Sequence, residues 1–233
     1  MTNHVTYTLN DGVATIAMDD GKANALSTDM LGNLEAAFDQ AEKDNAIVVL
    51  TGREGVFCGG FNLKEMGNGP QDALVLTSLG SKLARRIMAF PRPVILLASG
   101  HTIAMGAFLA LACDYSVIIE GDFKVGLNET LIGMTMHNFG IEMGRYHLPM
   151  NYFNRCVINA EIFSPKGAVH AGFFDKVIPA EQLPMAPAMI GQMFGQLNET
   201  AFKNTKNRSR KDIFAILDQA IEDDLDPEKV HAM

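Results

Sequence analysis

The hydrophobic residues of this chain follow two spacings, one typical of strands and the other of helices. Residues 5–9 and 13–18 are short β-rich runs on either side of the turn triplet 10–12, a pattern that predicts a β-hairpin. Residues 47–50 and 94–98 are continuous apolar runs. Such runs are expected of strands that are buried on both faces of a sheet.

Helical spacing separates these strands. Ser27 is a suitable N-cap for a helix over residues 28–44, and further helices are expected over 71–90 and 106–112, with another strand at 115–120. The first of these helices would bury one face, made of Met30, Leu31, Leu34, Phe38 and Ala41. Strands that alternate with helices predict an α/β fold with right-handed crossovers.

The final part of the chain has a different pattern. After about residue 180 only helical spacing is present. The 233 residues are therefore predicted to form an α/β core over 1–180 and a C-terminal helical region over 181–233.

Composition and charge narrow the possible functions. Hydrophobic residues make up 48% of the chain, as in globular proteins, and the formal charge of −8 argues against nucleic acid as a partner. Cys58, Cys113 and Cys156 are widely spaced and form no CxxC pair, so neither a disulfide framework nor a metal site is expected. A reducing cytoplasm fits this cysteine usage best, and the first residues do not resemble a signal peptide.

One apolar stretch, residues 94–113, is long enough to cross a membrane. Residues 99–102 are polar and would lie near its middle, where polar groups are costly. The stretch is better interpreted as strand, turn and helix, with Ser99 and His101 in the turn, and no membrane partner is expected.

Several common catalytic motifs are absent from the sequence. It contains no GxGxxG after a strand, no GxxxxGK[ST], no HExxH and no GxSxG. Nucleotide-binding Rossmann and P-loop functions, zinc peptidases and serine hydrolases of the elbow type therefore lack support.

Three segments carry candidate chemistry. Residues 57–66 include paired glycines that allow a backbone to approach a ligand closely. Residues 99–115 contain a turn that opens an apolar helix, whose first N–H groups are unpaired. Residues 126–133 place a single carboxylate, Glu129, among apolar neighbours.

Together, in this order and spacing, these segments resemble the crotonase, or enoyl-CoA hydratase/isomerase, superfamily. Residues 22–26 match its early NAL segment, 57–66 its FSAGxDLxEM loop, and 100–114 its second glycine loop and following helix. Residues 126–130 are similar to the segment that carries the one catalytic acid of the Δ3,Δ2-enoyl-CoA isomerases. The resemblance implies a spiral of stacked ββα units, with a C-terminal helical region that forms trimers or dimers of trimers.

The resemblance also implies roles for individual residues. The backbone N–H groups of Phe61 and Met105 would form an oxyanion hole, although the family usually has glycine at the second position, and Glu129 would be the catalytic acid/base. Phe108, Met134 and His137 are assigned to the acyl pocket. The residues assigned to coenzyme A are Lys22, Ala23, Ala25, Gly59, Asn62, Leu63, Lys64 and Lys206.

The residue types favour isomerisation over hydration. Hydratases of the family use two glutamates, and the second would stand at Phe108, which cannot activate water. Movement of a double bond from C3 to C2 needs only one carboxylate. The substrate would be a coenzyme A thioester of fatty acid metabolism, with no permanently bound cofactor.

Two alternatives stay open at this point. One is a hydratase, or another enzyme with crotonase-type enolate chemistry, that recruits His137 or Glu142. His137 is interpreted first as a pocket-wall residue and Glu142 as an ion-paired or solvent-facing carboxylate. The other alternative is a non-catalytic protein that binds acyl-CoA.

A basic cluster lies in the C-terminal region, made of Lys203, Lys206, Arg208, Arg210 and Lys211. Charge alone favours a solvated helix face, and the alternative is a clamp for the phosphates of coenzyme A.

Overall fold

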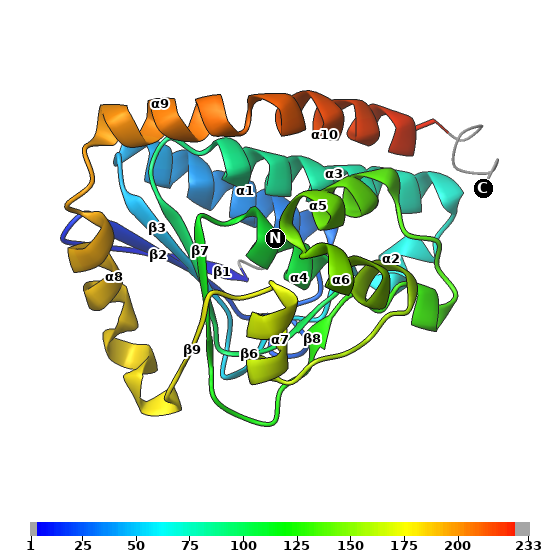
Figure 1. Cartoon of the computed structure of the whole chain (residues 1–233), viewed down its shortest axis with the longest axis horizontal. Coiled ribbons are helices and arrows are strands. Elements are labelled where there is room, and N and C mark those ends of the chain that lie inside the picture. The colour runs from blue at the N-terminus through cyan, green and yellow to red at the C-terminus, as the bar shows by residue number, and fades with distance from the viewer. Residues whose placement is uncertain (1–3, 227–233) are drawn as a thin grey trace.

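The computed structural model describes residues 4–226, so the end of the predicted C-terminal region lies outside the described residues. Its strands form two sheets (Figure 1). The larger has the order β1-β2-β3-β5-β7-β9, with strands Val5–Asn10, Val13–Met18, Ile47–Thr51, Val94–Ala98, Tyr115–Ile119 and Lys176–Ile178. The smaller has the order β4-β6-β8, with strands Gly55–Cys58, Gly100–Ile103 and Val125–Gly126. Only β1 and β2 pair antiparallel among these neighbours.

Successive segments of the chain repeat one pattern. β3 lies in the large sheet, β4 in the small sheet, and helices α2 (Leu63–Met66) and α3 (Pro70–Ala89) follow. The pattern repeats with β5, β6 and α4 (Met105–Ala112), and again with β7, β8 and α5 (Asn138–His147). Each turn adds one parallel strand to each sheet, which confirms the predicted spiral of ββα units.

The other helices complete the layers. They are α1 (Thr28–Lys43), α6 (Met150–Phe153), α7 (Pro165–Ala171), α8 (Ala186–Phe194), α9 (Glu199–Ser209), α10 (Lys211–Asp224), the 3-10 turns η1 (Thr130–Ile132) and η3 (Ala180–Met185), and the π turn η2 (Asn154–Ile158). The predicted cap of α1 is confirmed, because Ser27 Oγ accepts the N–H of Met30 at 3.1 Å. The turn expected at His101 is wrong: this residue lies in β6, where Gly100–Ile103 pair with the neighbouring strands of the small sheet.

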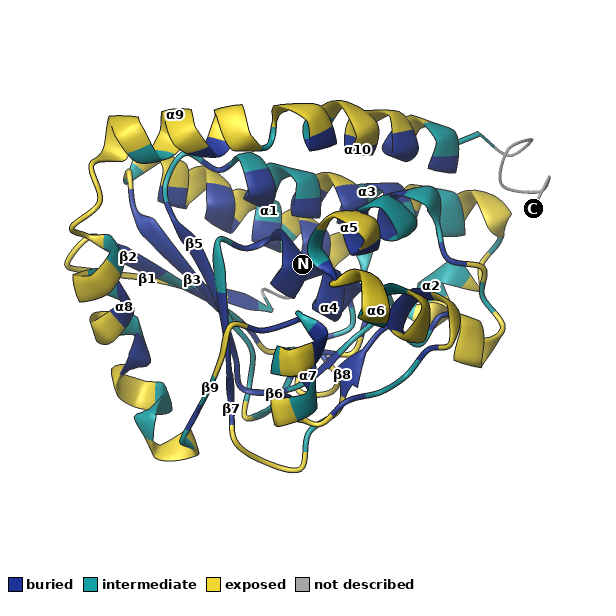
Figure 2. Cartoon of the chain, viewed as in Figure 1, coloured by how far each residue is buried: buried dark blue, intermediate teal, exposed yellow. Residues whose placement is uncertain are grey.

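Helix α4 is the centre of the hydrophobic core. All its residues are buried, and Figure 2 shows it dark blue between the sheets and the outer helices. No helix within residues 4–226 has the length and apolar character needed to span a membrane. The apolar stretch at 94–113 is instead divided among β5, β6 and α4, as the strand-and-helix interpretation expected.

A buried ion network joins α9 and α10 to the core. Lys206 Nζ donates to Asp114 Oδ2 at 2.6 Å, and Arg210 lies 3.1 Å from the other carboxylate oxygen. The Lys206 side chain is only 3% exposed. Burial lowers the pKa of Lys206, and the neighbouring Asp114 opposes that shift. Two members of the basic cluster therefore point inward.

Removal of the Lys206 ammonium should destabilise the protein strongly. Lys206→Met leaves Asp114 buried with one cation fewer, and the loss of one partner of a buried pair typically costs about 3–5 kcal/mol. Lys203→Met is the matched control, because Lys203 is exposed on the same helix and should change stability by about 0.5 kcal/mol or less. Urea unfolding of both variants measures the difference; equal stabilities would contradict the structural role of the network.

Candidate active site

The first loop of the site, residues 59–62 between β4 and α2, is held in place by a buried asparagine. Asn24 Nδ2 donates to Met18 O at 3.0 Å and to Phe57 O at 3.1 Å, which ties the segment before α1 to the end of β4. Farther along, Leu26 N–H donates to Gly60 O and Asn62 N–H donates to Leu26 O, in a parallel bridge between Leu26 and Phe61. In such a bridge Leu26 bonds to the two neighbours of Phe61, so the N–H of Phe61 itself points to the side opposite Leu26.

The second loop, at Ala104 between β6 and α4, brings the Met105 amide close to the first loop. Met105 is the first residue of α4, where a backbone N–H has no partner within its own helix. A Cβ on Gly60 would lie 2.8 Å from Ala104 Cβ and 3.8 Å from Met105 N, so the two loops are in contact. Gly60 adopts φ +97°, a left-handed conformation that favours glycine.

The residue with unusual backbone angles in the second loop is Ala104, not Met105. Ala104 has φ +51° and ψ −122°, and its N–H donates to Gly126 O at 2.9 Å. A non-glycine residue in this region stores about 1–3 kcal/mol of strain. Because Ala104 takes this strain, Met105 can begin a regular helix with its amide free of that helix.

Glu129 follows β8 and the 3-10 turn η1 begins directly after it. The hydrogen bond from Ala104 to Gly126 fixes the end of β8 against the second loop. Glu129 is 8% exposed, and its Oε2 is buried without a hydrogen-bond partner among the described residues. Burial raises the pKa of Glu129 to about 7, although a backbone hydrogen bond acts in the opposite direction.

Two cavities meet at Glu129. The outer cavity has a volume of about 300 Å³ and the inner one about 170 Å³. They share Phe61, Met66, Glu129 and Met134. The outer cavity is bordered by Ala23, Ala25, Gly59, Asn62, Leu63, Ala104, Asn128 and Ile132. The inner cavity is bordered by Ala73, Leu74, Thr77, Thr135, Met136, His137 and Asp224.

The structure places the predicted coenzyme A residues in two different situations. Ala23, Ala25, Gly59, Asn62 and Leu63 border the outer cavity, and Lys22 and Lys64 are exposed beside them in sequence. Asn62 is also an N-cap, because its Oδ1 accepts the N–H groups of Lys64 and Glu65. These assignments to coenzyme A stay predictions.

The prediction for Lys206 is wrong. Its ammonium is buried against Asp114 and is not available to a phosphate group. Figure 1 shows α9, which carries Lys206, and α2, beside the outer cavity, at opposite ends of the molecule. Sequence charge alone could not reveal that this lysine points inward.

The residues predicted for the acyl pocket lie in two places, and their assignment to an acyl chain stays a prediction. Met134 and His137 border the inner cavity. Phe108 does not: it is fully buried in α4, and its ring lies behind His137, with centroids 5.5 Å apart in an edge-to-face arrangement. Burial lowers the pKa of His137, and the negative charge of Asp224 opposes the shift. Glu142 pairs with Arg145 at 3.4 Å, as its simpler interpretation expected.

Asp224 is a site residue that sequence reasoning missed. It comes from the end of α10 and accepts hydrogen bonds from the backbone N–H groups of Asn138 and Phe139 at 2.7 and 2.9 Å, and from Asn138 Nδ2 at 2.8 Å. It therefore caps α5 from a distant part of the chain and closes one side of the inner cavity. In the sequence it belongs to an acidic run, which gives no sign of this contact.

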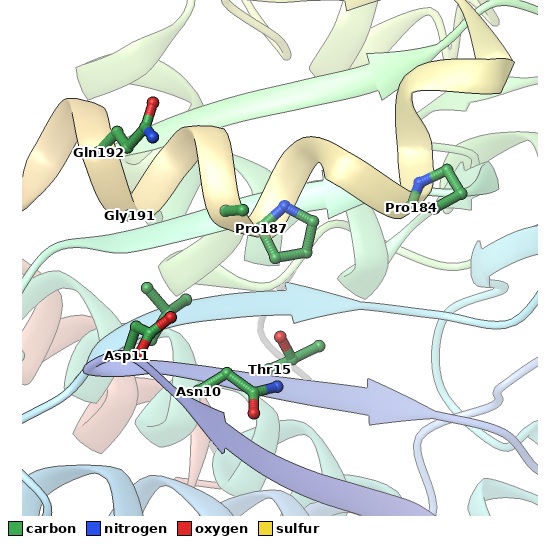
Figure 3. Close-up of a pocket in the computed structure, with 9 residues that line it drawn as sticks. Asn10, Asp11, Thr15, Pro184, Pro187, Gly191 and Gln192 are labelled. Atoms are coloured by element: carbon green, nitrogen blue, oxygen red, sulfur yellow. The ribbon is translucent and has the colours of Figure 1, made fainter.

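A larger cavity of about 510 Å³ lies elsewhere, between the β1–β2 hairpin and α8. Figure 3 shows Asn10, Asp11 and Thr15 on the hairpin side, and Pro184, Pro187, Gly191 and Gln192 on the other. Asp11 is the one titratable residue that borders it. The groups suited to acid–base chemistry lie at the two smaller cavities instead.

Comparison with known proteins agrees with the fold described above. The family model described as enoyl-CoA hydratase/isomerase matches residues 8–226. A crystal structure of an enoyl-CoA hydratase/isomerase family protein from Pseudomonas syringae is 47% identical, with a TM-score of 0.94 over 95% of this chain and 96% of that one. An enoyl-CoA isomerase from Mycobacterium tuberculosis is 35% identical, with a TM-score of 0.91 over 96% and 98% of the two chains.

The names of the relatives are mixed. A probable enoyl-CoA hydratase from Bacillus subtilis is 32% identical over 136 residues, which are 57% of this chain and 52% of the relative. This chain therefore matches about half the length of that protein. The comparisons establish the family and the fold, and the choice between isomerase and hydratase depends on the residues of the site.

The raised pKa of Glu129 should make its removal stabilising at high pH. The folded pKa of about 7 lies above the ordinary glutamate value of 4.5, so the stability linked to the protonated acid is complete below about pH 4.5. It is lost as the pH rises through 7, at a cost on the order of 3 kcal/mol. Glu129→Gln should therefore gain stability over the wild type between pH 5 and about pH 8.

Urea unfolding at several pH values measures this difference. Glu54→Gln, at an exposed position, controls for the loss of a negative charge. A stability difference between Glu129→Gln and wild type that does not change with pH would contradict the buried, unpaired state of Glu129.

Proposed function

The chain belongs to the enoyl-CoA hydratase/isomerase family, and within it we propose that the protein moves a double bond from C3 to C2 of an enoyl-CoA. One observation carries the proposal: Glu129 is a buried carboxyl group, its Oε2 without a partner among the described residues, at the junction of two cavities that Phe61 also borders, and Ala104, next to Met105, borders the outer one. The second carboxylate at the inner cavity, Asp224, already accepts three hydrogen bonds.

The proposed reaction uses these groups in a fixed order. The Glu129 carboxylate takes a proton from C2 of the 3-enoyl thioester, and the electron pair moves onto the thioester oxygen as an enolate. The amides of Phe61 and Met105 stabilise this charge, and each such donor contributes roughly 3 kcal/mol in comparable sites. Protonated Glu129 then returns the proton to C4, which leaves the double bond between C2 and C3.

The raised pKa of Glu129 suits this exchange. A carboxyl group with a pKa near 7 is a stronger base than an exposed glutamate and is still ionised in part at neutral pH. Because the same group must accept and then donate the proton, a pKa close to the working pH serves both steps.

The surroundings of Glu129 argue against hydration. Addition of water would need a second group to orient or protonate it, and the place of the family's second acid is taken by Phe108, which is fully buried. Glu142 is paired with Arg145. His137 borders the inner cavity, but its Nε2 is inaccessible to water. The site therefore supports proton transfer better than activation of water.

Loss of the Glu129 carboxylate should abolish most of the activity. Glu129→Gln keeps the shape of the side chain but cannot accept the C2 proton, so kcat with a 3-enoyl-CoA should fall by roughly 10²- to 10⁴-fold. Acyl-CoA affinity should change little. Glu142→Gln is the matched control and should keep the wild-type kcat. Isomerisation by Glu129→Gln at the wild-type rate would refute the assignment.

We also propose that the protein assembles as a trimer or a dimer of trimers. Three methionines on η3 and α8, Met185, Met189 and Met193, are between 56 and 60% exposed in the single chain. A gathering of large apolar side chains on one surface is typical of a contact between proteins.

Light scattering at micromolar concentration tests the assembly. The expected mass is that of three or six chains of 25.3 kDa. Met189→Lys together with Met193→Lys should shift the population toward smaller species. A wild-type protein that is a stable monomer at this concentration would show the proposal to be wrong.

A further inference from the structure

Both residues assigned to the oxyanion hole carry large side chains, and both side chains converge on one glycine. Gly80 lies in the middle of α3 and is buried. A Cβ at Gly80 would lie 2.5 Å from Cε1 and 2.6 Å from Cζ of Phe61, and 3.5 Å from Cγ of Met105. The first two distances are too short for any real contact between carbon atoms.

The backbone at Gly80 does not itself need glycine. Gly80 is within a regular helix and is not among the residues with positive φ. Glycine in a helix interior is less favourable than alanine, so its presence here costs stability. What the position gains is space for the ring of Phe61, which no other residue type would leave.

The position of this ring affects the reaction through the backbone of Phe61. The ring borders both cavities, so it is held between Gly80 on one side and the substrate path on the other. An added methyl group at residue 80 can be accommodated only if the ring moves toward the cavities or the Phe61 backbone turns. The bridge to Leu26 limits the first loop to small adjustments, and a small rotation redirects the Phe61 N–H.

We propose that Gly80 is a positioning residue, which keeps the Phe61 amide, and to a smaller extent the Met105 amide, aimed at the thioester oxygen. The proposal rests on the proposed function of these two amides. Gly80 itself does not touch the reacting atoms. Its role is to receive the two side chains so that their backbone donors stay in place.

Gly80→Ala provides the first test, with 3-enoyl-CoA as substrate. We expect kcat to fall by about tenfold or more, since removal of a single oxyanion donor costs about 10²–10³. KM should change by less than about threefold, and any fall in the melting temperature should be small, because the preference of the helix for alanine offsets part of the strain of moving the ring. Ser81→Ala, a change at the next buried residue of α3, is the matched control and should keep the wild-type kcat.

A double variant separates positioning from a general packing defect. In Phe61→Ala the ring is absent but the amide remains, so adding Gly80→Ala should lower kcat no further than about twofold. A wild-type kcat in Gly80→Ala would overturn the proposal. So would a loss of the same size in the Phe61→Ala background, or a rise in KM alone.

An infrared measurement distinguishes failure of this inference from failure of the isomerase proposal. Butyryl-CoA labelled with ¹³C at the thioester carbonyl has no double bond to move, and hydrogen bonding lowers its carbonyl stretching frequency. We expect a clear lowering in the wild type and a smaller one in Gly80→Ala. If the wild type shows this lowering and Gly80→Ala a smaller one, but the wild type does not isomerise 3-enoyl-CoA, the role of Gly80 stands and the proposed reaction fails. An equal frequency in both proteins would overturn the role of Gly80.

Discussion

The structure of this site depends on one costly arrangement: a carboxyl group without a charged partner in a wall of apolar side chains. Desolvation disfavours the ionised form of Glu129 and raises its pKa to about 7. The folded protein must supply the stability that this arrangement removes. It does so through a hydrophobic core that buries every residue of α4. This helix begins at Met105 and precedes the strands that lead to Glu129.

The two-sheet spiral explains how distant segments reach this point. Each turn of the spiral adds a strand to the small sheet, and the loops after β4, β6 and β8 therefore lie at the same edge. These loops carry Phe61, Met105 and Glu129. Parallel strands place their carboxyl ends side by side, so three short motifs far apart in the sequence become neighbours.

Many of the strands, helices and helix caps could be predicted from the sequence, because apolar runs and capping residues are local signals. The strands at 47–50 and 94–98 and the cap at Ser27 are examples. Contacts that depend on packing between distant segments could not be predicted. A lysine in a charged cluster gives no sign that it will be buried, as Lys206 is, and Asp224 gives no sign that it caps α5.

The family resemblance assigned Phe108 to the acyl pocket, but its fully buried ring does not border the inner cavity and instead contacts His137, which does. The chemical consequence is unchanged, because a buried phenyl ring offers no group to activate water. The apolar surroundings of Glu129 therefore favour an enolate reaction with one proton-transferring group.

The most direct test compares two substrates with the wild-type protein under the same conditions. With a 3-enoyl-CoA the conjugated 2-enoyl product should accumulate, as shown by its ultraviolet absorbance and by product identification. With crotonyl-CoA the conjugated absorbance should persist, because the proposed site has one proton-transferring group, Glu129, and Phe108 stands in place of a second acid. Rapid loss of the crotonyl-CoA absorbance, with no conversion of the 3-enoyl-CoA, would contradict the account.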